Sequence, residues 1–328
     1  MPTSASSGKR NMTLIASVSR SSGLERGGDD LKDHGIQEEY RAFIQGKIDD
    51  APEIWQTRGV HNLSKEEAER RAETRDNILI LLRKLREGIS ASKRSDAFAI
   101  EAYETSLFLA VISGNHRRIA PIVSQITPEP YEGIEGPHPH AALAPTIALL
   151  YHLAASFPSQ AIFQQQLGLF QQGPSSLLPP DSPEYTWIRS LAASLRQMNV
   201  ARFSRLTAPP AIPLTKPDEL ARALDDLRAL AEQALHAALD MLREKVREHA
   251  WDVLRTAYKE LSSTADGAPW LARSLALDIE PGSVEGEPGS KDEASGLQDL
   301  ARWLEGQAQL GRVKRKEGVE GRWLVCKS

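Results

Sequence analysis

The side chains whose types and spacing could support a function gather at the C-terminal end of the chain. Between Gly311 and Ser328, six lysines and arginines stand against two acidic residues, Glu317 and Glu320. A basic hairpin beside an aromatic side chain can contact a phosphate backbone. The sequence therefore indicates a candidate contact surface for nucleic acid or a partner protein, made of Arg312, Lys314, Arg315, Lys316, Arg322, Trp323 and Lys327.

The same residues have a second interpretation, which requires no ligand. Charged side chains keep an exposed edge strand soluble and prevent it from pairing with other sheets. Trp323 would then belong to the core of a small domain rather than to its surface. The sequence is compatible with both interpretations.

Metal chemistry has little support in the sequence. His138 and His140 stand close together, but in a proline-rich loop, where a His-Pro-His run is typical of a solvated turn. Cys326 is the single cysteine, so the chain has neither an internal disulfide nor a Cys-x-x-Cys pair for zinc. We expect no metal site and a reducing compartment.

Catalytic and nucleotide-binding patterns are missing as well. His152, His236 and His249 lie in predicted helices, without a nucleophilic serine or cysteine in a recognisable context. No glycine-rich phosphate motif occurs. The adjacent Asp225 and Asp226 would point about 100° apart on a helix, so they cannot form a facing acid–base pair. We therefore expect a protein that is not an enzyme and has no cofactor.

The basic residues need a hairpin to position them. Gly318 and Gly321 flank its turn, and the residues that follow alternate in polarity, as in a strand with unlike faces. The predicted elements are helices over 268–277 and 294–308 and strands over 311–316 and 322–327. Together with the end of a preceding helix, this is the order of a winged helix, expected at about residues 243–328.

Helical periodicity dominates the chain before this module. Helices are predicted over 36–50, over 64–89, in three helical hairpins at 95–126, 145–170 and 187–206, and over 218–262. Ser64 is a candidate N-cap because Glu67 follows three residues later. The last stretch is one helix or two with a bend, and its leucine stripe is interpreted as core rather than as a coiled coil. The predicted fold class is an all-α helical-repeat domain of TPR-like α-hairpins, followed by a C-terminal winged helix with a small β-hairpin.

These patterns divide the chain of 328 residues into parts. We predict a disordered, mobile tail over 1–36, a helical-repeat domain over 37–217, and a linker helix with the winged-helix domain over 218–328, including a flexible acidic insert at 280–293. The net charge of -4 gives no global attraction to nucleic acid. No apolar run is long enough to span a bilayer and no secretory signal is recognisable. The expected location is nuclear, cytoplasmic or both.

Two segments resemble a known family. The stretch RSDAFAIEAYETSLFLAVISGNHRRI, from Arg94 to Ile119, is similar to a helical hairpin of the SAC3/GANP group. The stretch WIRSLAASLRQMNVARFSRLTAPPA, from Trp187 to Ala211, resembles a repeat of that group, and the C-terminal segments follow the order of its winged helix. The resemblance covers about residues 75–328 and implies a PCI-type architecture. This architecture is shared by a small proteasome-lid subunit, a small COP9-signalosome subunit and subunit k of a translation-initiation complex.

The resemblance implies a non-catalytic scaffold subunit that assembles a multiprotein complex, in nuclear mRNA processing or export, with RNA contact through the basic wing. An alternative is a regulatory subunit of the proteasome-lid, signalosome or initiation-factor type that binds no RNA. In both cases the expected partners are other PCI-type subunits, bound through the edge of the winged helix. No membrane partner is expected.

Overall fold

The computed structural model describes residues 12–18, 30–55, 64–128, 131, 142–172, 176–213, 225–264, 266–277 and 291–326. It is mostly helical, with a small antiparallel sheet near the C-terminus. The chain divides into two compact units, one of residues 1–145, 172–177 and 223–237, the other of residues 146–171, 178–222 and 238–328. These bounds differ from the predicted division at residue 217. Among the described helices, none combines the length and apolar composition that a membrane span requires.

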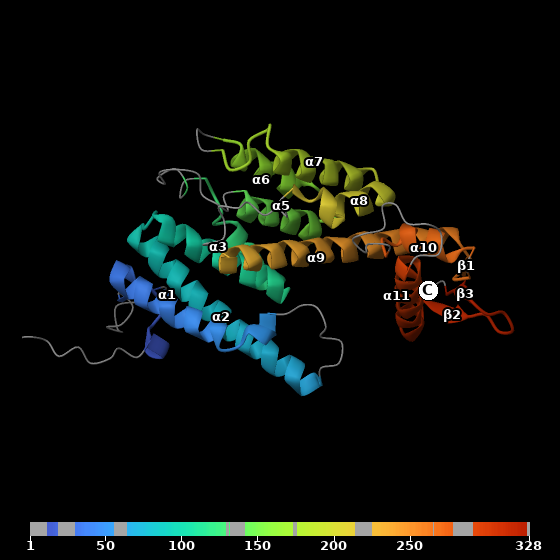
Figure 1. Ribbon diagram of the computed structural model, residues 1–328, viewed down its shortest axis with the longest axis horizontal. Helices are drawn as coiled ribbons and strands as arrows, with labels where there is room; N and C mark the ends of the chain where they lie inside the picture. Colours follow the sequence, from blue (N-terminus) through green and yellow to red (C-terminus); the bar gives the residue numbers. More distant parts are fainter. Residues whose placement is uncertain are drawn as a thin grey trace, which may run out of the picture. The chain divides into compact units, whose positions relative to one another are not determined.

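The first unit contains the helices α1 (His34–Asp49), α2 (Lys65–Ser92), α3 (Ala97–Ser113) and α4 (His116–Val123), shown in blue to green in Figure 1. Of these, α3 and α4 form the helical hairpin that the sequence predicts. The side chain of Ser64 caps α2 and that of Asp96 caps α3, each by accepting a backbone N–H bond. Gly114 ends α3 with a φ of 68°, which glycine adopts without strain. The hairpin at 95–126 is confirmed.

The predicted mobile tail is wrong for residues 12–18 and 30–36. Asp30–Lys32 form a 3-10 helix, Leu31 is fully buried, and α1 begins at His34. Gly88 of α2 makes this packing possible, because a Cβ at that position would lie 2.5 Å from the carbonyl oxygen of Leu31. Ile15 is buried too. A few apolar side chains are enough to hold these residues in place.

The second unit contains the other two predicted helical hairpins. They are formed by α5 (Leu143–Ala155) with α6 (Ala161–Phe170), and α7 (Pro183–Arg196) with α8 (Val200–Thr207), green to yellow in Figure 1. Only the first residues of α5 belong to the first unit. The indole N–H of Trp187 on α7 donates a 2.8 Å bond to the carbonyl oxygen of Leu206 on α8. This bond ties the third pair together.

The long helix α9 runs from Asp225 to Ala257 without interruption. Leu235, Leu239 and Leu242 on it are fully buried, so the core interpretation of its stripe is confirmed for these residues. The helix ends five residues before the predicted end at 262, and Glu260–Ser262 form strand β1 instead. The sequence prediction extends the helix to 262 because Leu261 follows Leu254 by seven residues, a spacing that fits a helix.

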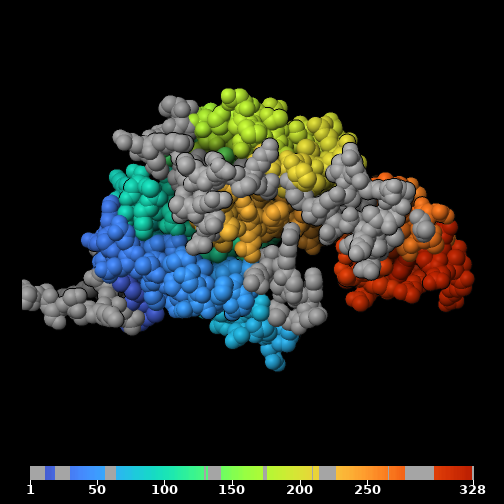
Figure 2. All heavy atoms as spheres, in the orientation of Figure 1, coloured from blue at the N-terminus to red at the C-terminus, as the bar shows by residue number. Residues whose placement is uncertain are grey.

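The C-terminal module consists of the end of α9, β1, α10 (Ala268–Ser274), α11 (Lys291–Gln309), β2 (Val313–Arg315) and β3 (Arg322–Val325). The strands are antiparallel in the order β1-β3-β2. Its core includes Trp251 and Leu304, and the rings of Trp251 and Trp303 meet edge to face at 4.9 Å. Figure 2 shows the module's atoms in orange and red. Most of the predicted insert at 280–293 lies outside the described residues, but α11 already begins at Lys291.

Candidate functional site: the C-terminal sheet

The three-stranded sheet has an inner and an outer face. Leu261, Val313 and Trp323 are buried and occupy neighbouring positions in the register, so they face the core of the module. Side chains alternate along each strand, so the next residues point to the opposite face. The outer face therefore carries Glu260, Ser262, Lys314, Arg322 and Leu324. Both interpretations of the basic residues can be judged from this arrangement.

Trp323 belongs to the core rather than to an exposed contact surface. Its side chain is only 5% exposed, and its indole N–H donates a 3.1 Å bond to the hydroxyl of Ser263. The guanidinium group of Arg315 lies over its ring, 5.3 Å from the centroid. Trp323 therefore has no free face on which a base could stack.

Three of the candidate cations already have carboxylate partners. Lys316 lies 2.9 Å and Arg322 3.5 Å from the carboxylate of Glu260 on β1. The hydrogen bond from Lys316 is the largest influence on Glu260 and lowers the pKa of its carboxyl below the ordinary value. Arg315 forms an ion pair with Glu305 on α11. These pairs interrupt the basic surface that the sequence indicates.

Of the remaining three candidates, two are exposed to solvent and one lies outside the described residues. Lys314 is exposed and forms no ion pair with any residue in the described ranges. Arg312 is exposed and donates a 3.3 Å bond to the side-chain oxygen of Gln307. Lys327 lies outside the described residues. The structure thus brings five of the seven predicted residues to the surface of the hairpin, but three of them are paired with carboxylates.

Strand β2 forms an outer edge of the sheet. The amide of Lys316 donates to Arg322, and Arg312 accepts from the amide of Cys326. Hydrogen-bonded and non-hydrogen-bonded pairs alternate in an antiparallel ladder, so the backbone groups of Val313 and Arg315 point away from β3. Val313 is only 2% exposed, so the backbone groups of Arg315 are the ones that an extended strand of another chain could reach.

An open depression lies between the hairpin and α11. It is lined by Thr264, Glu305, Arg315, Val319 and Arg322, among others. Acidic and basic side chains both contribute, so the depression has no uniform charge. The sequence gives no sign of these partners, because Glu260 precedes Lys316 by 56 residues and Glu305 belongs to a different element, α11.

His152, His249 and Cys326 lie among the residues that the structure describes. Burial lowers the pKa of His152, and the ring of His249 meets that of Phe157 edge to face at 5.6 Å. Cys326 is half-buried at the end of the sheet. No group of three potential metal-ligating side chains occurs among the residues that the structure describes. His138 and His140 lie outside them.

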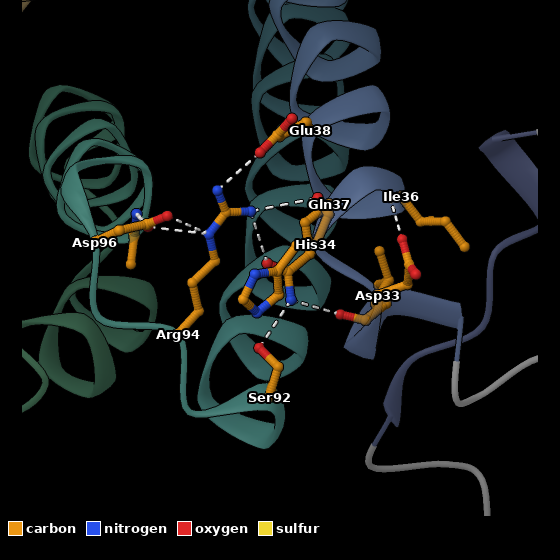
Figure 3. Close-up of polar contacts among 10 residues, drawn as sticks. Asp33, His34, Ile36, Gln37, Glu38, Ser92, Arg94 and Asp96 are labelled. Carbon is orange, nitrogen blue, oxygen red and sulfur yellow. Dashed lines mark hydrogen bonds and ion pairs between the residues drawn. The ribbon is translucent and has the colours of Figure 1, made fainter.

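The first residue of the segment Arg94–Ile119, which resembles the SAC3/GANP hairpin, is a nearly buried arginine (Figure 3). The side chain of Arg94 is 6% exposed and forms ion pairs with Asp96 at 2.9 Å and Glu38 at 2.8 Å. It also donates to the side chain of Gln37 and the carbonyl oxygen of His34. Its guanidinium group thus joins α1 to the start of α3. All these bonds are internal, so Arg94 is a structural link.

A buried carboxyl lies further along the same helix. Glu104 of α3 is fully buried and accepts a 3.1 Å bond from the hydroxyl of Tyr131. Burial raises the pKa of Glu104 to about 8, and the neighbouring charge of Glu101 adds to this effect. Near neutral pH this carboxyl is therefore largely protonated.

Comparisons with models of protein families, with curated proteins and with solved structures found no match to this chain.

Proposed function

We propose that the chain is a non-catalytic scaffold subunit of the PCI type, which joins a multiprotein complex through its C-terminal module. The observation that carries this proposal is the element order: helix α9, β1, α10, α11, β2 and β3, with the sheet order β1-β3-β2. This is the order of a winged helix. The helix pairs before it are compatible with the TPR-like part of the proposed architecture.

The proposed partner is another PCI-type subunit, bound at the edge of β2. The outward backbone groups of the exposed Arg315 supply hydrogen bonds for an added strand. Strand addition requires no unusual side chains, which fits a surface where charges of both signs are already paired. The exposed Lys314 precedes Arg315 along the strand.

The similarity of Arg94–Ile119 to the SAC3/GANP group supports a role in nuclear mRNA processing or export. Within this proposal, RNA contact rests on Arg312 and Lys314, the two exposed cations without a carboxylate partner in the described ranges. The pairing of Lys316, Arg322 and Arg315 with Glu260 and Glu305 favours the second candidate function. That candidate is a subunit of the proteasome-lid, signalosome or initiation-factor type that touches no RNA.

Purification of the tagged full-length chain, followed by cross-linking and mass spectrometry, tests the proposal. We expect stoichiometric companions that themselves contain helix pairs and a winged helix, with cross-links from Lys314 to one of them. mRNA-export proteins among the companions would support the first assignment, and lid, signalosome or initiation-factor subunits the second. A chain recovered without such companions would contradict the scaffold function.

A further inference from the structure

A second charged site lies in the first unit, between α2 and α4. It is a cavity of about 250 Å³ whose walls combine aliphatic and basic side chains. The aliphatic part comes from Leu79, Pro121 and Ile122, and the basic part from Arg83, Arg86, Arg117 and Arg118. Glu87 is the single carboxylate among its described lining residues. Four arginines around one small cavity make a strongly positive site.

Two of these arginines have their charge compensated within the unit. Arg83 lies 3.3 Å from Glu87, and Arg118 lies 3.8 Å from Asp76. Glu87 also accepts a hydrogen bond from the hydroxyl of Ser17. The acidic groups near the cavity are thus already engaged, which leaves Arg86 and Arg117 to determine its net charge.

Arg86 is the unusual member of the site. It is 6% exposed and donates from Nη1 to the side-chain oxygen of Gln125. Its buried Nε has no hydrogen-bond partner, and no residue in the described ranges forms an ion pair with it. Burial lowers the pKa of Arg86 to about 10, so the side chain still carries its charge at neutral pH. An unpaired buried cation costs free energy that an anion in the cavity would recover.

The shape and lining of the cavity indicate the kind of anion. A guanidinium group presents its donors in a planar fork that fits the two oxygens of a carboxylate. The aliphatic walls suit the methylene groups of a glutamate side chain, whereas inorganic phosphate would gain nothing from them. Arg117 is exposed at the second position of α4, so the cavity is accessible from the surface.

We infer that Arg86 and Arg117 bind the carboxylate of an acidic side chain that a partner protein inserts between α2 and α4. The inference deepens the proposed scaffold function and rests on it, because it assigns a second contact to the first unit. This contact requires only an acidic segment in the partner, and it is independent of the β2 edge.

Fluorescence anisotropy with a labelled ten-residue polyglutamate peptide tests this inference on the full chain. A polyglutamine peptide of the same length shows whether the charge is required, and unlabelled inorganic phosphate competes as a bare anion. The test variant is Arg117→Glu, because an acidic residue in the first turn of a helix does not weaken that helix. The matched control is Lys65→Glu, which reverses another exposed cation in the first turn of a helix, α2.

We expect polyglutamate to bind and polyglutamine not to bind. Arg117→Glu should weaken polyglutamate binding at least about tenfold, the loss typical of a charge-assisted hydrogen bond. Lys65→Glu should change the affinity less than about twofold, and Arg86→Met should repeat the loss provided that its circular dichroism is unchanged. Equal affinity of Arg117→Glu and the unaltered chain would overturn the inference, as would displacement of all bound peptide by phosphate at equimolar concentration. Neither result would affect the recovery of companions through β2, so the two proposals fail separately.

Discussion

The ammonium group of Lys316 lies 2.9 Å from a carboxylate oxygen of Glu260, a residue that precedes it by 56 positions. This contact joins the turn of the hairpin to β1 at the other side of the sheet. It also removes one cation from the surface that could attract a phosphate backbone. Charge counted along the hairpin therefore overstates the positive charge that a ligand would meet.

Glu260→Gln should increase the affinity of the protein for a short single-stranded RNA at low salt. The substitution frees Lys316 and Arg322 from their common partner. Exposed ion pairs are weak, so we expect a gain of less than about fivefold that disappears at high salt. The control is Glu317→Gln, which removes an exposed carboxylate of the same hairpin. An equal gain in both variants would show that Glu260 has no particular masking effect.

Glu104→Gln should reduce the pH dependence of the free energy of unfolding. The folded-state pKa of Glu104 is raised to about 8 by burial, so the folded protein holds a proton that the unfolded chain releases at a lower pH. Stability from this group is fully present below about 4.5 and is lost as the pH rises through about 8. Urea unfolding between these pH values should show a smaller decline for the variant. A decline equal to that of the exposed-residue control Glu66→Gln would contradict the assignment.

Arg94→Ala should lower the free energy of unfolding by about 2 kcal/mol, because charge-assisted bonds from a nearly buried guanidinium are lost. Arg94→Lys should recover less than half of this loss, since an ammonium group lacks the planar fork. Denaturant unfolding provides the measurement. Arg302→Ala, which removes a largely exposed pair with Asp299, should cost less than about 0.5 kcal/mol. Similar losses at both positions would argue against Arg94 as a link between helices.

Gly88→Ala should destabilise the first unit by about 1–3 kcal/mol, the usual cost of overpacking. The new methyl group would meet the backbone of Leu31, which cannot move as a flexible side chain would. Gly46→Ala is the matched control, because nothing lies within 4 Å of that position in α1. It should stabilise the protein by about 0.5–1 kcal/mol. If Gly88→Ala behaved like the control, Leu31 would not be packed against α2.

Local signals predict much of this fold from the sequence. Ser64 begins a helix as expected, because capping depends on residues that are close along the chain. The sequence does not predict the positions of Leu31 and of β1, because each depends on a distant partner, Gly88 for the first and β3 for the second. The same reason hides Glu260, which precedes its partner Lys316 by 56 residues. Spacing alone cannot show that Glu260 and Glu305 reach Lys316 and Arg315.

The central claim is that the edge of β2 joins the chain to its complex, and a pair of substitutions at Arg315 tests it most directly. Arg315→Ala removes the contacts with Glu305 and Trp323 but keeps the outward backbone N–H, whereas Arg315→Pro removes both. Companions recovered with each tagged variant are quantified by mass spectrometry, with thermal unfolding as the check on folding. We predict that Arg315→Ala retains the companions and Arg315→Pro loses at least about nine-tenths of them. Equal recovery with both variants would contradict assembly through this edge.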